Sequence, residues 1–476
     1  MRMNRMGRVS ALLLAALFLL GSPASAQLSQ RDRQQSASQH EQIIAAYGGV
    51  YDHPEIGPYV ARVTTRIAGA SSMPNESFRV TVLNSPVVNA FALPGGYVYV
   101  TRGLVALANS EAELASVIGH EIAHVTQKHG QGRQDRAIGA TLLGAILGVA
   151  VGSDIVNQIF NIGASGFLAD YSRDQEEEAD RVGLDMLARA GYDPYAASSF
   201  LASLGAQSAL HAQLQGSQYD PNRVDWLASH PATGQRVNAT RLQAQQTGLA
   251  PGTRAVGADA HYAAIDGMIY GDDPEQGFVR GRKFIHPKMR FQFEVPEGFQ
   301  MANGSTAVIA QDTSGAQIKF DGAPRGSAPN MAAYITQVWA RDARISQIEA
   351  IEVNGIATAT GVTRVKGKDV RLVAYDAGDQ KGVFRFLIST PSQQTARLAS
   401  PMRDMVVSFR RLTASQAEQV SALRLDVRTV TRRDSVASLA AKSAFEDAVE
   451  QRFRVLNGLS EGDALVSGQK IKLVVD

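Results

Sequence analysis

The sequence of 476 residues predicts a multidomain α+β protein. Three observations support this prediction. Apolar residues recur at helical spacing through much of residues 27–250, the pattern changes near Pro251 and Gly252, and short runs that alternate like strands dominate residues 260–415. We therefore expect a mainly helical first domain with a small β-sheet, an antiparallel α+β domain, and a third small unit at 425–476.

The first 26 residues have the three features of an export signal. Arginines precede an uninterrupted apolar run at 11–20, and Ala24-Ser25-Ala26 supplies a small-x-small cleavage site. The apolar run is shorter than the roughly 20 residues that span a bilayer. We expect cleavage after Ala26 and export to the periplasm, rather than an N-terminal membrane anchor.

Charge and cysteine content exclude several classes of function. Without the three arginines of the signal, 44 basic side chains face 45 acidic ones, and this balance gives no support for nucleic-acid binding. The chain has no cysteine, which excludes disulfides, thiol catalysis and cysteine-ligated zinc. Nitrogen and oxygen ligands remain available for a metal ion.

The elements of the first domain follow from composition and spacing. We expect a mobile polar leader at 27–40 and a helical pattern at 41–68 that is broken near Gly48 and Pro54. A strand at 78–84, a turn at 91–96 and a strand at 97–101 should follow. The last elements expected are a helix capped by Ser110 and Glu113 and a helix at 175–190 ended by Gly191. In the next domain, six strand-like runs alternate with helical patterns at 331–343 and 396–412, and no residue constellation there implies chemistry.

Residues 137–153 form an uncharged run bounded by Arg136 and Asp154. Its glycines at four-residue spacing favour close helix packing. The run is slightly short for a membrane span and rich in Gly and Ala. Membrane contact is one interpretation, and a buried hairpin or a hydrophobic surface facing substrate is the other.

Residues 120–124 read His-Glu-Ile-Ala-His, the pattern HExxH. On an α-helix, residues four apart share one face, so His120 and His124 can bind one ion. Glu121 lies one residue on, where its carboxylate can hold and deprotonate a water molecule at the metal. The same letters also occur on ordinary amphipathic helices with solvated side chains, but here the helix is predicted independently and a strand precedes it.

A catalytic zinc ion needs a third protein ligand. A histidine six residues after His124 is excluded, because Gly130 stands there. His129 is five residues after His124 and is expected beside the ligands or at the surface. The third ligand must therefore come from elsewhere in the chain.

The acidic run at 176–180, EEEAD, supplies that ligand on a later helix. We predict Glu176 as the ligand and Asp180, one turn on, as the acceptor for the ring N–H of a zinc-bound histidine. Glu177 and Glu178 are expected to be solvated, although three consecutive acids leave the register open. The expected cofactor is one zinc ion per chain.

Three segments resemble the HtpX/BepA-type gluzincins, a group of zinc metalloproteases. They are NAFALPGGYVYVTRGLV (89–105), HEIAHVTQKHG (120–130) and SRDQEEEADRVG (172–183). The resemblance covers roughly residues 40–245 and implies a zincin-type peptidase domain, here 27–250, in a BepA-like periplasmic protease. It implies His120, His124 and Glu176 as ligands, Glu121 as the base and Asp180 as the supporting carboxylate.

The same resemblance implies further roles around the cleft. Residues 97–101 would be the edge strand to which an extended substrate adds, and Asn89 would lie at the cleft. His230 would lie in a loop over the active site, able to reach the metal, with Arg236 nearby. The tetratricopeptide array of the family's C-terminus is missing, which puts any shared partner in doubt.

The end of the chain shows a second resemblance, to LysM modules. VRTV (427–430) with RDSVASLA (433–440), FRVLNGL (453–459) and LVSGQKI (465–471) carry it. The resemblance implies a small βααβ module at 425–476 and binding to peptidoglycan. Arg433-Asp434 stands where Gly-Asp is usual, so glycan affinity is open.

These features together predict a zinc endopeptidase of the periplasm that degrades misfolded or misassembled envelope proteins, associated with the cell wall or the outer membrane. Its partners would be unfolded envelope polypeptides and peptidoglycan, without nucleic acid. The alternatives are a peptidoglycan-active metallohydrolase and a latent, chaperone-like envelope protein.

Overall fold

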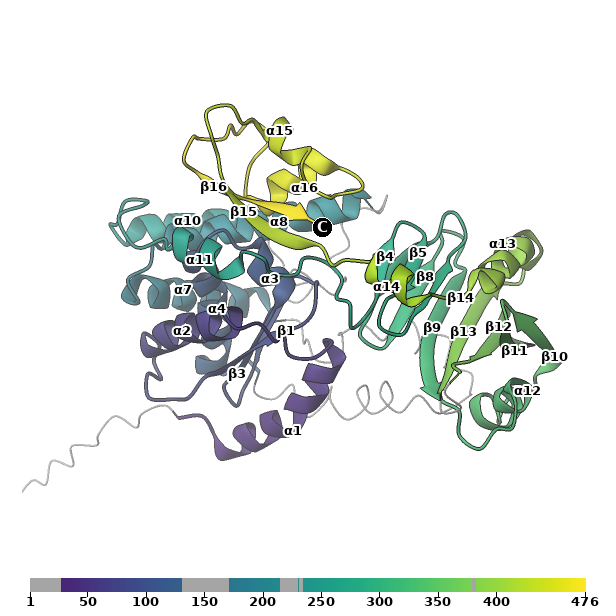
Figure 1. The fold of residues 1–476 in the computed structure, drawn as a ribbon. Coiled ribbons are helices and arrows are strands. Elements are labelled where there is room, and N and C mark those ends of the chain that lie inside the picture. The colour runs from purple at the N-terminus through teal and green to yellow at the C-terminus, as the bar shows by residue number, and fades with distance from the viewer. Residues whose placement is uncertain (1–26, 131–170, 215–229, 231–233, 379–381) are drawn as a thin grey trace, which may run out of the picture.

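The computed structural model describes residues 27–130, 171–214, 230, 234–378 and 382–476. It is an α+β multidomain structure, as predicted. Figure 1 shows a helical unit with a small sheet, a sheet-rich unit in green beside it, and a C-terminal unit in yellow over helix α8. The run at 137–153 lies outside the described residues, and none of the helices within them is long and apolar enough to cross a membrane.

The first unit begins with helix α1 (Gln30–Ala46), so the prediction of a mobile leader at 27–40 is wrong. Ser29 caps the helix by accepting a hydrogen bond from the backbone N–H of Asp32. The sequence of α1 is polar, and tertiary contacts hold it in place: Ser36 Oγ accepts from the backbone N–H of Gly95, and Ile43 is fully buried. Helix α2 (Ile56–Gly69) follows.

A three-stranded sheet contains β1 (Arg79–Leu83), β2 (Ala90–Leu93) and β3 (Tyr97–Thr101) in the order β1-β3-β2. Strand β3 is central, parallel to β1 and antiparallel to β2, so the expectation of an edge strand at 97–101 is wrong. The turn expected at 91–96 begins only at Pro94, because residues 90–93 pair with β3 in a hairpin. Within this sheet, β2 is the edge strand that lies beside α4.

The remaining helices of the first unit are α3 (Arg102–Leu107), α4 (Glu111–Thr126), α7 (Arg173–Arg189), α8 (Tyr195–Leu214), α10 (Gly234–Gln246) and α11 (Ala258–Ile265). Helix α4 is central and packs against α2, α7, α8 and the sheet. The hydrophobic core of the first unit also includes Tyr262, Ile265 and Met268, which come from the segment after residue 257.

The second unit consists of two antiparallel sheets. The smaller has the order β14-β6-β5-β4, with β4 (Phe278–Arg280), β5 (Lys283–His286), β6 (Phe291–Glu294) and β14 (Arg410–Arg411). The larger has the order β10-β11-β12-β13-β9-β8-β7, with β7 (Gln300–Asn303), β8 (Ala307–Gln311), β9 (Gln317–Pro324), β10 (Ser346–Val353), β11 (Ile356–Val365), β12 (Lys368–Asp376) and β13 (Gly382–Pro391).

Phenylalanines from both sheets meet in the core of the second unit. They are Phe284, Phe291 and Phe293 from the smaller sheet and Phe320, Phe384 and Phe386 from the larger one, together with residues of helix α13 (Thr395–Ser408). The helix expected at 331–343 is a short α12 (Met331–Ala333) continued by a π-helical turn (Tyr334–Trp339). Helix α14 (Ala414–Glu418) leads out of this unit.

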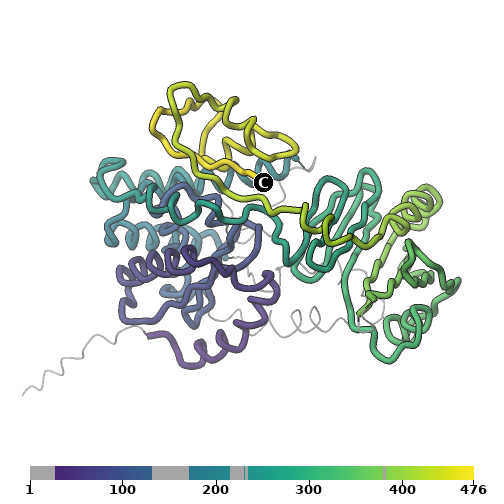
Figure 2. Tube along the Cα trace, in the orientation of Figure 1, coloured from purple at the N-terminus to yellow at the C-terminus, as the bar shows by residue number. Residues whose placement is uncertain are grey.

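The chain then returns to the first unit, as Figure 2 shows. The C-terminal unit has the order β15 (Arg424–Thr429), α15 (Val436–Ala440), α16 (Val449–Leu456) and β16 (Lys470–Val475). It has a small core of its own around Phe453, yet Leu425, Leu456 and Val474 belong to the core of the first unit. Backbone hydrogen bonds join Leu425 to Gly267 and Met268. The unit is therefore packed against the helical domain as part of its structure.

Candidate metal centre

His120, Glu121 and His124 lie within α4, in which every residue from 112 to 126 is buried. The helix begins as predicted, with Ser110 Oγ accepting from the backbone N–H of Glu113 at 3.1 Å. The carboxylate of Glu113 accepts from the backbone N–H of Asn109, one residue before the expected partner. The predicted apolar face is buried in full: Leu114, Val117, Ile118, Ile122 and Val125.

Glu176 lies in the first turn of α7, which begins with a capping box between Ser172 and Gln175. Two glycines let α7 cross α4 at close range. A Cβ atom added at Gly183 would lie 3.0 Å from the backbone nitrogen of His120, and one added at Gly119 would lie 3.3 Å from the carbonyl oxygen of Gly183. Because the two backbones touch at this point, the carboxylate of Glu176 reaches the histidines of α4.

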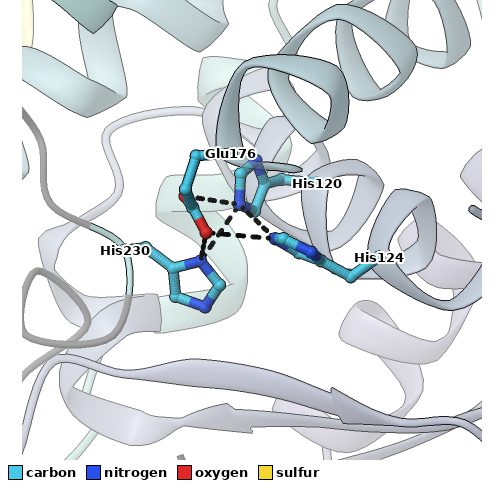
Figure 3. A group of neighbouring side chains, drawn as sticks. All are labelled: His120, His124, Glu176 and His230. Atoms are coloured by element: carbon cyan, nitrogen blue, oxygen red, sulfur yellow. Dashed lines mark hydrogen bonds and ion pairs between the residues drawn. The ribbon is translucent and has the colours of Figure 1, made fainter. Parts of the chain in front are cut away.

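Four buried side chains converge in the centre of the unit: His120, His124, Glu176 and His230 (Figure 3). His120 Nε2 and His124 Nε2 are 3.0 Å apart, and they lie 3.5 Å and 3.4 Å from the carboxylate oxygens of Glu176. His230 Nδ1 lies 2.8 Å from Glu176 Oε1 and 3.2 Å from His120 Nε2. Among the described residues this is the group that could hold a metal ion.

The spacing and the donor types fit zinc. A tetrahedral zinc ion with ligands at about 2.0–2.1 Å keeps those ligand atoms about 3.3–3.4 Å apart. These five separations lie between 2.8 and 3.5 Å, and all four ligand atoms lie within 4.8 Å of one another. Three imidazoles and one carboxylate are ligands that zinc accepts, and small shifts of the side chains would place all four around one ion.

The electrostatics of the centre also favour a cation. Burial alone would lower the pKa of His120, but the carboxylates of Asp180 and Glu176 outweigh burial and raise it to about 9. Two buried acids, Glu121 and Glu176, and the half-buried Asp180 face one guanidinium group, that of Arg236. The carboxylates thus stabilise positive charge at the histidine ring, and a bound divalent ion would supply that charge.

Asp180 lies where the sequence predicted it, beside a ligand. Its Oδ1 is 2.9 Å from His120 Nδ1, on the side of the ring that faces away from the cluster. Arg236 donates two hydrogen bonds of 2.8 Å to Asp180, and its Nη1 lies 2.9 Å from Glu176 Oε2. Burial would raise the pKa of Asp180, but Arg236 and His120 lower it to about 2. Arg236 therefore holds two carboxylates of α7 in place.

Glu121 and His230 lie next to each other at the remaining side of the cluster. Both are 1% exposed, and His230 Nε2 is 3.6 Å from Glu121 Oε1. Asn89 is not brought into the cluster: it is fully buried just before β2, and its Nδ2 donates to the hydroxyl of Tyr47 at 3.4 Å.

Two further side chains contact His124: Tyr171, which sequence reasoning missed, and His129, for which it left a place beside the ligands or at the surface open. Tyr171 stacks on its ring with centroids 3.7 Å apart, and the only sequence signal was an aromatic residue directly before the cap of α7. His129 lies 2.9 Å from His124 and also contacts Glu178, which the sequence assigned to solvent. Helical spacing could not show this contact, because the chain leaves the helix before His129.

Comparison with known proteins agrees with this geometry. The family model for peptidase family M48 matches residues 55–244, which include all four cluster residues. This part of the chain is therefore similar to the peptidases of family M48. This match supports the resemblance to the HtpX/BepA-type gluzincins.

Proteins similar to this part of the chain occur in bacteria and in mitochondria. The chain is 31% identical over 243 residues to the beta-barrel assembly-enhancing protease of Yersinia pestis, covering 49% of this chain and 47% of that protein. It is 28% identical over 237 residues to the protein of that name from Escherichia coli, covering 48% and 47%. It is 36% identical over 169 residues to the mitochondrial metalloendopeptidase OMA1 of Arabidopsis thaliana, covering 36% and 32%. The alignments span less than half the length of these relatives.

Replacing Glu176 with alanine is expected to remove the metal. The variant loses the carboxylate ligand and leaves Arg236 beside the two histidines, where its charge repels a cation. Zinc content, measured after dialysis, should fall from about one ion per chain to near zero. Glu177→Ala is the matched control, because Glu177 is exposed on the same turn. Zinc retained by Glu176→Ala and lost by Glu177→Ala would show that the register of the acidic run is wrong.

Proposed function

We propose that this chain is a zinc-dependent endopeptidase of the bacterial periplasm that cleaves misfolded or misassembled envelope proteins. The observation that supports it most strongly is the buried cluster of three imidazoles and one carboxylate with Glu121 at its side. The name of the bacterial relatives, beta-barrel assembly-enhancing protease, supports a role in the envelope. The signal features of residues 1–26 support export.

In the proposed reaction, the residues of the chain bind the metal, hold the water and move its proton. His120, His124 and Glu176 would hold zinc, which when bound polarises the scissile carbonyl and lowers the pKa of the attacking water. Glu121 accepts the proton of that water and passes it to the leaving amine. Asp180 and Arg236 keep His120 and Glu176 in place during these steps.

The first experiment compares substrates. Purified protein loaded with zinc should cleave unfolded casein, lose this activity with a chelator and recover it when zinc is returned. Purified sacculi should release no muropeptides. Soluble muropeptides without casein cleavage would instead indicate a peptidoglycan-active hydrolase, the role that a LysM-like module at 425–476 would suit. If neither substrate is cleaved, even by the His230→Ala variant described in the next paragraph, the result would favour a chaperone-like protein.

We propose that His230 is a latch in the resting enzyme. Its ring takes the fourth position of the cluster and lies against Glu121, the place where the catalytic water and the substrate carbonyl must enter. His230→Ala is expected to raise basal casein cleavage by about tenfold, equivalent to a latch of about 1.4 kcal/mol. Rates are compared at equal zinc loading.

A slower His230→Ala enzyme would contradict the latch. It would show that His230 stabilises the oxyanion of the transition state, as a donor facing the carbonyl oxygen would do. An unchanged rate would show that His230 does neither. His53→Ala serves as the control, because His53 lies outside the metal centre near the start of α2.

A further inference from the structure

Three acidic side chains of helix α7, at every second position along the chain, lie in or beside the metal centre. Glu176 lies among the ligands, and Asp180 contacts His120. Glu178 contacts His129, which in turn contacts His124. We propose that His129, held by Glu178, is a positioning residue that orients His124 for the metal, as Asp180 orients His120.

The three groups form a line away from the metal centre. His124 presents Nε2 to the cluster, 3.0 Å from His120 Nε2, and its Nδ1 lies 2.9 Å from His129 Nδ1. On the far side of the second ring, His129 Nε2 lies 3.1 Å from Glu178 Oε2. His124 is 2% and His129 6% exposed, so water does not compete freely for these hydrogen bonds.

The chemistry of the ligand fixes where the protons lie. A histidine that binds a metal through Nε2 carries its hydrogen on Nδ1. His124 Nδ1–H then donates to the lone pair of His129 Nδ1, since two nitrogens at 2.9 Å share one proton. His129 consequently carries its own hydrogen on Nε2 and donates it to Glu178. This arrangement satisfies every ring nitrogen and keeps His124 in the tautomer that binds a metal.

The end of α4 builds this contact. Five residues of regular helix would place His129 about 140° around the axis from His124. Instead Lys128 adopts a left-handed conformation with φ of 60°, and the backbone N–H of His129 donates to the carbonyl of His124 at 3.0 Å. Gln175 of α7 donates to the carbonyl of His129 at 3.4 Å. The chain therefore folds back so that the second ring lies against the first.

The test measures zinc affinity by competition with a chromophoric chelator, without substrate. His129→Ala should weaken zinc binding by about 10- to 100-fold, the usual effect of losing a hydrogen-bond partner of a ligand. His129→Asn places an amide oxygen near the position of Nδ1 and should recover most of this loss. Glu178→Ala should weaken binding by up to about tenfold, and it removes little packing because Glu178 is 43% exposed. Glu177→Ala should bind zinc like the unchanged protein.

A second readout separates orientation from general packing. Cobalt-substituted His129→Ala should show an altered d–d absorption spectrum, while the melting temperature of the metal-free protein stays close to that of the parent. Unchanged zinc affinity in His129→Ala would overturn the proposal. Affinity as low in His129→Asn as in His129→Ala would overturn it too, because then the ring acts by packing. If His129→Ala fails to fold, His129→Asn and Glu178→Ala decide the outcome.

This inference rests on the proposed metal centre and not on the proposed substrate. Zinc binding is measured with the whole chain in the absence of any polypeptide. If the zinc affinities of the variants follow the expected order but casein is not cleaved, the result would count against the peptidase proposal alone. Cleavage with unchanged affinities would count against the role of His129 alone.

Discussion

Replacing Glu121 with glutamine is expected to reduce casein cleavage by about 10²- to 10⁴-fold, the usual contribution of a general base. Glutamine keeps the size of the side chain and its capacity to form hydrogen bonds, but it cannot take up the proton of the attacking water. The three proposed ligands and His230 are untouched, so zinc should remain near one ion per chain. Cleavage is measured with fluorescently labelled casein at equal zinc loading.

The measurement is sharper in the His230→Ala background, where the latch no longer limits the basal rate. Glu121→Gln should lower that raised rate by the same factor. Casein cleavage that survives the change in both backgrounds would exclude Glu121 as the base. A large loss of zinc would show instead that its carboxylate takes part in holding the metal.

Replacing Lys472 with methionine is expected to destabilise the protein by several kcal/mol, because each buried acceptor left without its donor costs about 1–3 kcal/mol. Lys472 lies on β16 and is fully buried. Its Nζ lies 2.7, 3.1 and 2.8 Å from the carbonyl oxygens of Ala106, Leu107 and Ala108, at the end of α3. Methionine fills the same space but leaves these carbonyls without a donor.

The charge of Lys472 is balanced by Glu113 in the first turn of α4. Burial lowers the pKa of Lys472 to about 7 against the attraction of Glu113, and burial raises the pKa of Glu113 to about 7. Each group therefore depends on the other to remain charged in the interior. Glu113 also stabilises the start of helix α4 by accepting a hydrogen bond from the backbone N–H of Asn109. Loss of Lys472 should consequently loosen the N-terminus of α4.

Urea unfolding of Lys472→Met, Glu113→Gln and the double variant measures this coupling. We expect the double variant to be more stable than the sum of the single changes predicts, since neither charge is left unpaired. Lys470→Met is the matched control: Lys470 lies two residues earlier on β16 and pairs with Asp259, which is 88% exposed. Its effect should stay below about 1 kcal/mol. Equal stability of both methionine variants would contradict the assigned role of Lys472.

This packing changes the expectation for the C-terminal unit. From the sequence, residues 425–476 are expected to form a separate third unit. In the structure, Leu425, Leu456 and Val474 are part of the core of the first unit, and Lys472 reaches into it. Removing the unit should therefore expose the helical core and lower the stability of the peptidase domain. Peptidoglycan binding by this unit remains a proposal.

The candidate metal ligands on α4 could be predicted because their information is local. His120, Glu121 and His124 are fixed by helical periodicity, and the cap at Ser110 marks where that helix begins. Predicting Glu176 and Asp180 required one further inference, that a later helix rich in acidic residues lies beside the helix of the two histidines. The structure places both carboxylates next to His120. The strands at 79–83 and 97–101 likewise follow from alternation along the chain.

Contacts between distant segments could not be predicted in this way. The polar sequence of α1 has no strong helical pattern, and its contacts with the turn after β2 hold it as a helix. The position of β3 between β1 and β2 depends on strand order, which alternation within a strand does not encode. The meeting of Gly119 with Gly183 depends on how two helices cross.

The sequence by itself determined the chemistry that we propose for this protein, a nitrogen- and oxygen-ligated zinc centre with a glutamate base, because ligand type and helical spacing are properties of a single segment. The tertiary structure decided which groups hold that centre in place. Arg236 bridges Glu176 and Asp180, His129 reaches His124 through a left-handed turn, and Lys472 joins the C-terminal strand to the domain. These contacts join residues far apart in the chain or beyond the regular helix, and only the packing of the folded protein brings them within hydrogen-bond distance.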